Sequence, residues 1–163
     1  MKNIVILVIF ICSCSHFRAN EQKIGHIKKI LIFGNSILKH EPDSSICWYN
    51  NWGMAASSID SDFLHILIQY IKDTSCKIFT KTVVDFEHNY KQFNLHSLDS
   101  FKEINADIII MRFGENVANN AGQDFINKYR DFINYIKNDS TIIVITDGFW
   151  PHKNVNHLIK NFA

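Results

Sequence analysis

Three short apolar runs without polar alternation constrain the fold of this chain most strongly. They cover residues 30–33, 107–111 and 141–146. Strands of this kind are buried on both faces, as in the interior of a parallel sheet. A more mixed run at 77–84 is typical of an edge strand. We therefore expect a parallel sheet with strand order 2-1-3-4, and functional groups at the carboxyl ends of its strands.

Two amphipathic stretches between these runs predict helices that cover the sheet. Apolar side chains recur at helical spacing in both stretches. The expected core-facing residues are Phe63, Leu64, Leu67, Ile68 and Ile71 in the first stretch, and Phe125, Ile126, Tyr129, Phe132, Ile133 and Ile136 in the second. Strands that alternate with helices predict a three-layer α/β/α sandwich with right-handed crossovers. The 163 residues suffice for one such domain without help from disulfides or metals.

Charge and composition exclude several classes of partner. The chain has 17 basic and 16 acidic side chains, so no net field attracts nucleic acid or an anionic membrane surface. Its content of 47% hydrophobic residues argues against disorder. No Cys/His cluster has metal-ligand spacing and no glycine-rich phosphate loop is present. We therefore expect neither a metal nor a cofactor.

The amino-terminal segment is typical of an export signal. Lys2 precedes an apolar run at 4–11, which is too short to span a bilayer. The residues that follow the run end in Cys14 and resemble a lipobox, which would make Cys14 the lipidated first residue of the mature protein. Ordinary signal-peptide cleavage and a buried hydrophobic strand are the alternatives.

The expected organisation is a signal peptide at 1–13, a linker at 14–28 and one domain at 29–163. The protein is then exported and either lipid-anchored at a bacterial cell envelope or periplasmic or extracellular, with membrane contact only through the lipid anchor. Cys47 and Cys76 remain in the mature chain, where buried thiols are the expected state rather than a disulfide.

A serine follows the first predicted strand directly. In Gly34-Asn35-Ser36-Ile37, the glycine permits a tight turn, and Ser36 sits at the carboxyl end of the strand, where it can face a substrate. A serine in such a position is more often a helix cap or a turn residue. The neighbouring segments decide between these interpretations.

Three segments together resemble the SGNH/GDSL hydrolases. Residues 30–37 resemble the first block of that family, with Asn35 where many members have Asp. Residues 48–62 resemble the second block of a bacterial subgroup, in which the N–H of a glycine, here Gly53, points at the oxyanion. Residues 108–117 resemble the third block, whose asparagine, here Asn116, is another oxyanion donor.

The resemblance implies a fold, a nucleophile and an oxyanion hole. The fold is the flavodoxin-like α/β/α sandwich, and the reaction is attack of Ser36 on an ester without a metal. The backbone N–H groups of Ser36 and Gly53 and the side-chain amide of Asn116 would stabilise the oxyanion. Turn residues remain the alternative interpretation of Gly53 and Asn116.

The family's fourth block is a D-x-x-H after a fifth strand, and it has no counterpart at that place. We therefore expect a C-terminally incomplete domain that lacks the fifth strand. Two D-x-x-H matches occur elsewhere: 62–65 is interpreted as a helix start with a packed histidine, and 85–88 as a solvated loop pair. His152, with Asp147, follows the fourth strand and is a weak candidate base, because it begins about 10 Å from Ser36 in strand spacings.

These patterns predict an exported SGNH-type serine esterase that acts on a small-molecule or carbohydrate ester. His40 and Trp52 are candidate substrate contacts. Without a recognisable base, we expect at most trace hydrolysis. The alternatives are a truncated gene product and a catalytically silent lipoprotein that binds a glycan at a rim formed by His40, Trp48, Trp52 and Trp150.

Overall fold

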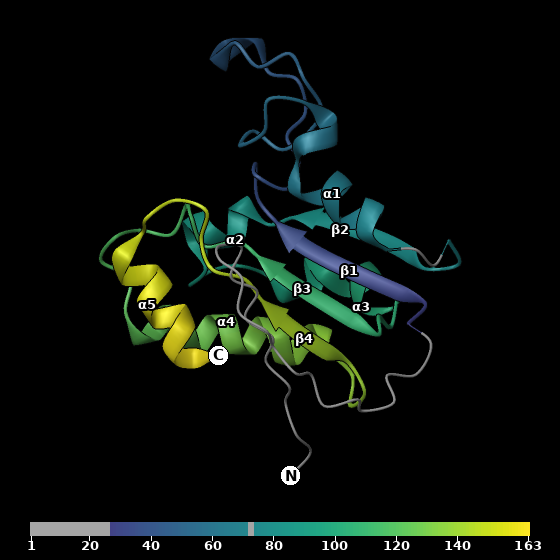
Figure 1. Cartoon of the computed structure of the whole chain (residues 1–163). Coiled ribbons are helices and arrows are strands. Elements are labelled where there is room, and N and C mark those ends of the chain that lie inside the picture. The colour runs from purple at the N-terminus through teal and green to yellow at the C-terminus, as the bar shows by residue number, and fades with distance from the viewer. Residues whose placement is uncertain (1–26, 72–73) are drawn as a thin grey trace, which may run out of the picture.

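The computed structural model describes residues 27–71 and 74–163 (Figure 1). Its sheet has four parallel strands in the order β2-β1-β3-β4. The strands are β1 Lys29–Gly34, β2 Lys77–Thr82, β3 Ile108–Arg112 and β4 Ile142–Ile145. This confirms the α/β class, the strand order and the edge position of β2. The expected signal peptide, Cys14 and most of the linker lie outside the described residues.

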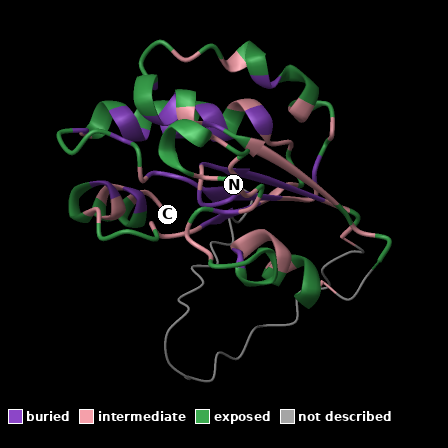
Figure 2. Ribbon diagram, turned by 90° about the horizontal axis from the view of Figure 1, so that it is seen from above, coloured by how far each residue is buried: buried purple, intermediate pink, exposed green. Residues whose placement is uncertain are grey.

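Two hydrophobic clusters, one on each face of the sheet, make a three-layer sandwich. The helices are α1 Phe63–Tyr70, α2 Val84–Asn89, α3 Asp99–Lys102, α4 Gln123–Ile136 and α5 Lys153–Phe162. The smaller cluster lies under α1, and the larger one packs against α2, α4 and α5. Figure 2 shows the buried strands enclosed between these layers.

The apolar stripe of α4 is confirmed. Its six predicted core residues are all buried. Phe132 packs edge-to-face on Phe33 of β1, with ring centroids 4.9 Å apart, and on Phe86 of α2 at 5.1 Å. Edge-to-face aromatic pairs add stabilisation beyond the area they bury. This aromatic core therefore fixes α2 and α4 against the central strand.

The predicted stripe of α1 is wrong at one position, because Ile68 is 43% exposed. Phe63, Leu64, Leu67 and Ile71 do pack on the sheet. At 3.6 residues per turn, Ile68 points roughly 85° away from the mean direction of those four side chains. No second described helix packs in this cluster beside α1 to cover that edge.

The connection from β2 to β3 also differs from the expectation. Strand β2 ends at Thr82 because the helix α2 begins at Val84, where the sequence predicted a continuing strand. A 3-10 helix, Leu95–Leu98, and α3 follow it. The mixed polarity of this connection hid three short helical elements. Helix α2 matters most, because it supplies a residue of the site.

The carboxyl ends of the strands meet at one edge of the sheet, and long loops gather there. The segment between β1 and α1 projects beyond this edge at the top of Figure 1. It contains the 3-10 helices Ser44–Ile46 and Ile59–Ser61. None of the described helices has the length and apolar character needed to span a membrane.

Candidate active site

Ser36 lies in the turn that follows β1 and is half-buried. Asn35 accepts the hydrogen bond that closes this turn, from the N–H of Leu38 at 2.9 Å. The Ser36 carbonyl accepts a hydrogen bond from the N–H of Met54 at 2.9 Å. Neither the hydroxyl nor the N–H of Ser36 takes part in a hydrogen bond between described residues. Both groups are therefore left without a hydrogen-bond partner among the described residues.

Gly53 lies directly against the Ser36 turn. A Cβ added to Gly53 would lie 2.0 Å from the carbonyl oxygen of Ile37, so only glycine permits this approach. The N–H of Gly53 donates to Oδ2 of Asp62 across 3.2 Å. Gly53 therefore lies beside Ser36, as the sequence predicted. Its role as an oxyanion donor stays a prediction, and it requires the N–H to turn away from Asp62.

Asn116 lies in the loop after β3, two residues beyond Gly114, which has a φ of +146°. Its side-chain Nδ2 donates to Oε2 of Glu87 across 2.7 Å. The other oxygen of the same carboxylate accepts from Asn35 Nδ2 at 3.0 Å. The Glu87 carboxylate therefore bridges Asn116 and Asn35, the residue next to Ser36. Ser36, Gly53 and Asn116 lie at the same end of the sheet.

Glu87 is a site residue that the sequence analysis missed. It belongs to α2 and is 1% exposed. Its Oε1 also accepts from the backbone N–H of Gly114 at 2.6 Å and from that of Asn116 at 3.3 Å. Hydrogen bonds to a buried carboxylate satisfy a charge that would otherwise be costly. A single glutamate on a short unpredicted helix carries no sequence signal for this role.

Glu115 forms the second buried carboxylate of the site. It accepts hydrogen bonds from Arg112 Nη1 at 2.5 Å and from Asn35 Nδ2 at 2.6 Å. The backbone N–H of Phe149, after β4, donates to it at 2.8 Å. Glu115 therefore ties together the ends of β1, β3 and β4. Its position inside the third block was the signal that could have revealed it.

Asn35 connects the two carboxylates and is fully buried. Its Nδ2 donates to Glu87 and to Glu115, and its Oδ1 accepts from the N–H of Ile37 at 3.0 Å. An aspartate at this position would have no N–H to donate and would add a third negative charge. The two glutamates therefore favour asparagine over aspartate at this position.

The negative charges of Glu87 and Glu115 also act on the hydroxyl of Tyr129 in α4. Burial raises the pKa of its hydroxyl, and the negative charges of Glu115 and Glu87 raise the pKa further. The hydroxyl is buried and has no hydrogen-bond partner among the described residues. A neutral tyrosine hydroxyl without a partner is an energetic cost at this place in the core.

The Asp62–His65 match forms a hydrogen-bonded pair. Oδ1 of Asp62 caps α1 by accepting the N–H of His65 at 2.7 Å, which confirms the interpretation of Asp62 as a helix start. The same oxygen lies 2.7 Å from His65 Nδ1. The second match differs, because Asp85 and His88 are both exposed on α2 and share no hydrogen bond among the described residues. That pair lies on a helix, not in the predicted loop.

The weak candidate base His152 is not oriented by Asp147. Its Nε2 lies 2.9 Å from the carbonyl oxygen of Val117, and its Nδ1 is buried without a partner among the described residues. Asp147 pairs with Lys160 at 2.8 Å. No histidine in the described ranges bonds to the Ser36 hydroxyl. The structure therefore gives Ser36 no hydrogen-bonded base.

Three residues that the sequence placed at the rim, His40, Trp48 and Trp52, instead hold the loop between β1 and α1 together. The indole N–H of Trp48 donates to the His40 carbonyl at 3.3 Å, and that of Trp52 donates to the Ala56 carbonyl at 3.2 Å. The two indole rings pack edge-to-face with centroids 5.9 Å apart. These contacts are internal, so substrate contact by His40 and Trp52 stays a prediction.

The loop after β4 carries a more accessible aromatic pair. Phe149 is 53% exposed and Trp150 is 57% exposed. Their rings pack edge-to-face with centroids 4.7 Å apart. Because the N–H of Phe149 bonds to Glu115, this pair is anchored to the buried network that holds Asn35. It stands at the carboxyl edge of the sheet.

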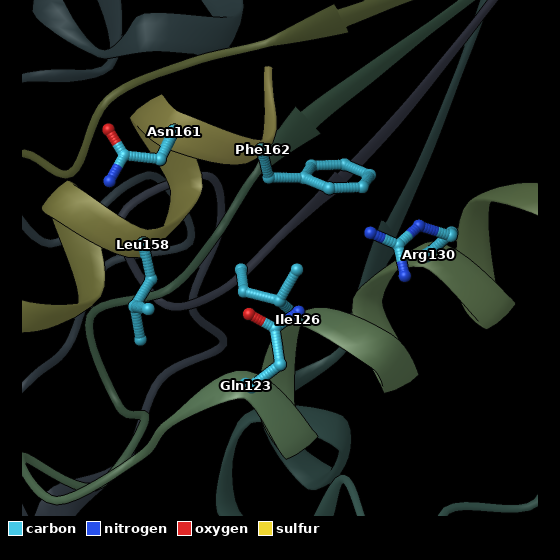
Figure 3. A pocket seen from close by; sticks show the side chains of 6 residues that line it. All are labelled: Gln123, Ile126, Arg130, Leu158, Asn161 and Phe162. Atoms are coloured by element: carbon cyan, nitrogen blue, oxygen red, sulfur yellow. The ribbon is translucent and has the colours of Figure 1, made fainter.

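Other possible sites lie apart from Ser36 or are not formed. An open pocket of about 410 Å³ lies between α4 and α5, and none of the predicted site residues lines it (Figure 3). Within residues 27–71 and 74–163, no group of three His, Cys, Asp or Glu side chains is arranged to hold a metal ion. Cys47 and Cys76 are not joined by a disulfide, but the expectation of buried thiols is wrong for Cys47, which is exposed on the loop between β1 and α1, and Cys76 is only partly buried.

Comparison with known proteins gives no relative. No family model, no curated protein and no solved structure matches the chain. The resemblance to the SGNH hydrolases therefore depends on the three sequence segments, and the arrangement of their residues is the basis for the functional argument.

Proposed function

We propose that the chain is an SGNH-type serine ester hydrolase with Ser36 as its nucleophile. One observation carries the proposal: Ser36, Gly53 and Asn116 come from separate segments and gather at the carboxyl end of a parallel sheet. That edge is where α/β folds bind their ligands. The unengaged hydroxyl of Ser36 supports the assignment of this residue as the nucleophile.

The reaction is acyl transfer through the serine. Ser36 Oγ bonds to the ester carbonyl carbon and loses its proton to water, while the carbonyl electron pair moves onto the oxygen. Collapse of this tetrahedral species breaks the ester C–O bond, and the leaving alcohol takes up a proton. Water then adds to the acyl-serine and releases the acid. The Ser36 N–H and the Asn116 amide stabilise both oxyanions, and Gly53 joins them once its N–H turns from Asp62.

Turnover by this arrangement is slow. A neutral hydroxyl is a weak nucleophile unless a base removes its proton during attack. No described histidine bonds to Ser36. Oxyanion donors and substrate binding alone leave roughly a thousandfold to ten-thousandfold acceleration over water.

The proposed substrate is an acyl ester on a carbohydrate. Phe149 and Trp150 expose aromatic surface at the same edge as Ser36. An exposed indole offers a flat apolar face for the C–H face of a sugar ring. Export with a lipid anchor at Cys14 belongs to this proposal, since extracellular glycans would then be within reach.

Addition of a small base to the solution tests whether Ser36 is the nucleophile. Purified protein and a Ser36→Ala variant are compared for release of acetate from an acetylated sugar, with rising imidazole. We expect trace release without imidazole and, above the release that imidazole causes without protein, a rate that rises with imidazole only when Ser36 is present, because no described residue occupies the hydroxyl. Equal rates for the two proteins at every imidazole concentration would overturn Ser36 as the nucleophile.

Glycan binding without turnover is the second candidate function. It is favoured by the missing base together with the exposed Phe149–Trp150 pair. It predicts that an acetylated oligosaccharide binds in calorimetry, that Trp150→Ala weakens this binding, and that imidazole releases no more acetate with the protein than without it. Tyr49→Ala, which removes another exposed aromatic ring, is the matched control.

A further inference from the structure

We propose that Glu87 is a positioning residue that orients the Asn116 amide for the oxyanion. This inference rests on the proposed function of Ser36. Glu87 reaches no substrate itself, since it is 1% exposed. It acts through Asn116, whose side chain and backbone it binds at once.

The contacts of Glu87 restrain both parts of Asn116. Oε2 accepts from the side-chain Nδ2 at 2.7 Å, and Oε1 accepts from the backbone N–H at 3.3 Å. The N–H of Gly114, on the same loop, donates to Oε1 at 2.6 Å. A hydrogen bond to an ionised acceptor is roughly twice as strong as one between neutral groups. The loop and the amide are therefore fixed by one carboxylate.

A carboxylate also decides which way the Asn116 amide faces. An ionised glutamate only accepts hydrogen bonds, so it binds the NH₂ group of Asn116 and not its carbonyl oxygen. The amide nitrogen carries two hydrogens, and Glu87 uses one of them. The second hydrogen is left for the developing oxyanion. A flipped amide would present an oxygen there and repel that charge.

Glu115 provides the matched comparison. Its side chain is 5% exposed and belongs to the same network. It binds Arg112, Asn35 and the Phe149 N–H and makes no bond to Asn116 among the described residues. If the network served stability alone, loss of either carboxylate would affect the site equally. The positioning role predicts that the two variants differ.

The experiment uses phenylboronic acid, which forms a tetrahedral adduct with a serine oxygen and mimics the oxyanion. Its dissociation constant is measured for the purified protein, Ser36→Ala, Asn116→Ala, Glu87→Gln, Glu115→Gln and the surface control Glu103→Gln. We expect Glu87→Gln and Asn116→Ala to weaken binding by a similar factor, about tenfold to a hundredfold. Glu115→Gln should weaken it much less, and Glu103→Gln not at all.

Nuclear magnetic resonance gives a second measurement, whose result would not change if Glu87 only stabilised the fold. The side-chain amide of Asn116 should show one strongly hydrogen-bonded proton in the unmodified protein and in Glu115→Gln, but not in Glu87→Gln. Thermal melting confirms that each variant is folded at the temperature of measurement. If Glu87→Gln does not fold, Glu87→Asp withdraws the carboxylate by one methylene and should give the same pattern.

The outcomes separate the two proposals. Binding that is lost in Ser36→Ala but unchanged in Glu87→Gln would overturn the role of Glu87 and leave Ser36 as the nucleophile. Binding that is weakened equally by Glu87→Gln and Glu115→Gln would show a structural network without a positioning residue. Absent binding, or binding that Ser36→Ala leaves intact, would overturn the proposed function and with it the purpose assigned to Glu87.

Discussion

The side-chain amide of Asn116 donates a hydrogen bond to Glu87 across 2.7 Å and links the loop after β3 to helix α2. The two residues are 29 positions apart in the chain. The buried carboxylate joins the loop of the third block to the turn that holds Ser36, because Asn35 donates to it as well. The geometry of the candidate site therefore depends on a helix that belongs to none of the three blocks.

Replacement of Asn35 by aspartate should destabilise the protein by about 3 kcal/mol or more, because it puts a third carboxylate beside Glu87 and Glu115 without an N–H to bridge them. The free energy of unfolding in urea measures the loss. The penalty should shrink as the pH falls and the added carboxyl group takes up a proton. Asn35→Asp as stable as the unmodified protein at pH 7 would mean that the two glutamates do not set this position.

Gly53→Ala should lower the free energy of unfolding by about 1–3 kcal/mol, because its Cβ would lie 2.0 Å from the Ile37 carbonyl oxygen and force the Ser36 turn apart. Gly122→Ala is the control, since its Cβ would meet only Asp124 Oδ1 at 3.7 Å. Denaturant melts compare the two variants. If both variants lost equally little stability, the close approach of Gly53 to the Ile37 carbonyl would be contradicted.

Tyr129→Phe should raise the free energy of unfolding by about 1 kcal/mol, because it removes a buried hydroxyl without a partner among the described residues. Tyr90→Phe is the contrasting variant: its hydroxyl donates to Asp124 at 3.1 Å, so its loss should be neutral or destabilising. Thermal melts show whether each variant is more or less stable than the unmodified protein. Destabilisation by Tyr129→Phe would show that the hydroxyl has a partner in solution.

The stability contributed by Asp124 should disappear in acid. Hydrogen bonding to Lys91, above all, lowers the pKa of this carboxyl from 3.8 to about 2. A carboxyl whose pKa falls on folding stabilises the protein above its unfolded pKa and loses that effect as the pH drops through the folded value. The difference in melting temperature between the unmodified protein and Asp124→Asn should thus shrink from pH 4 to pH 2. A constant difference across that range would contradict the ion pair with Lys91.

The sequence predicted the fold well, because strands that are buried on both faces appear in the sequence as uninterrupted apolar runs. The apolar runs of β1, β3 and β4 and the stripe of α4 were recognised from hydrophobicity alone. Helix α2 was missed because a six-residue helix carries too few turns to show periodicity. Ile68 was placed on the core face because periodicity does not say how wide a face the neighbouring elements cover.

The candidate site was predicted in part. Ser36, Gly53 and Asn116 lie at the edge of the sheet where the motifs put them. The carboxylates that bind Asn35 and Asn116 were not foreseen, because hydrogen bonds between segments 27 to 80 residues apart leave no local pattern. Asp147 and His152 follow the same strand but bind different partners, so proximity in sequence did not make them a pair.

A crystal structure of the protein with phenylboronic acid would show whether Ser36 is the nucleophile and Asn116 an oxyanion donor. We expect a bond between boron and Ser36 Oγ, with one boronate oxygen within about 3 Å of the Asn116 amide nitrogen and of the Gly53 N–H, which will have turned from Asp62. Boron bound elsewhere, or a boronate oxygen that points away from Asn116, would contradict the assignment of this edge of the sheet as a serine hydrolase site.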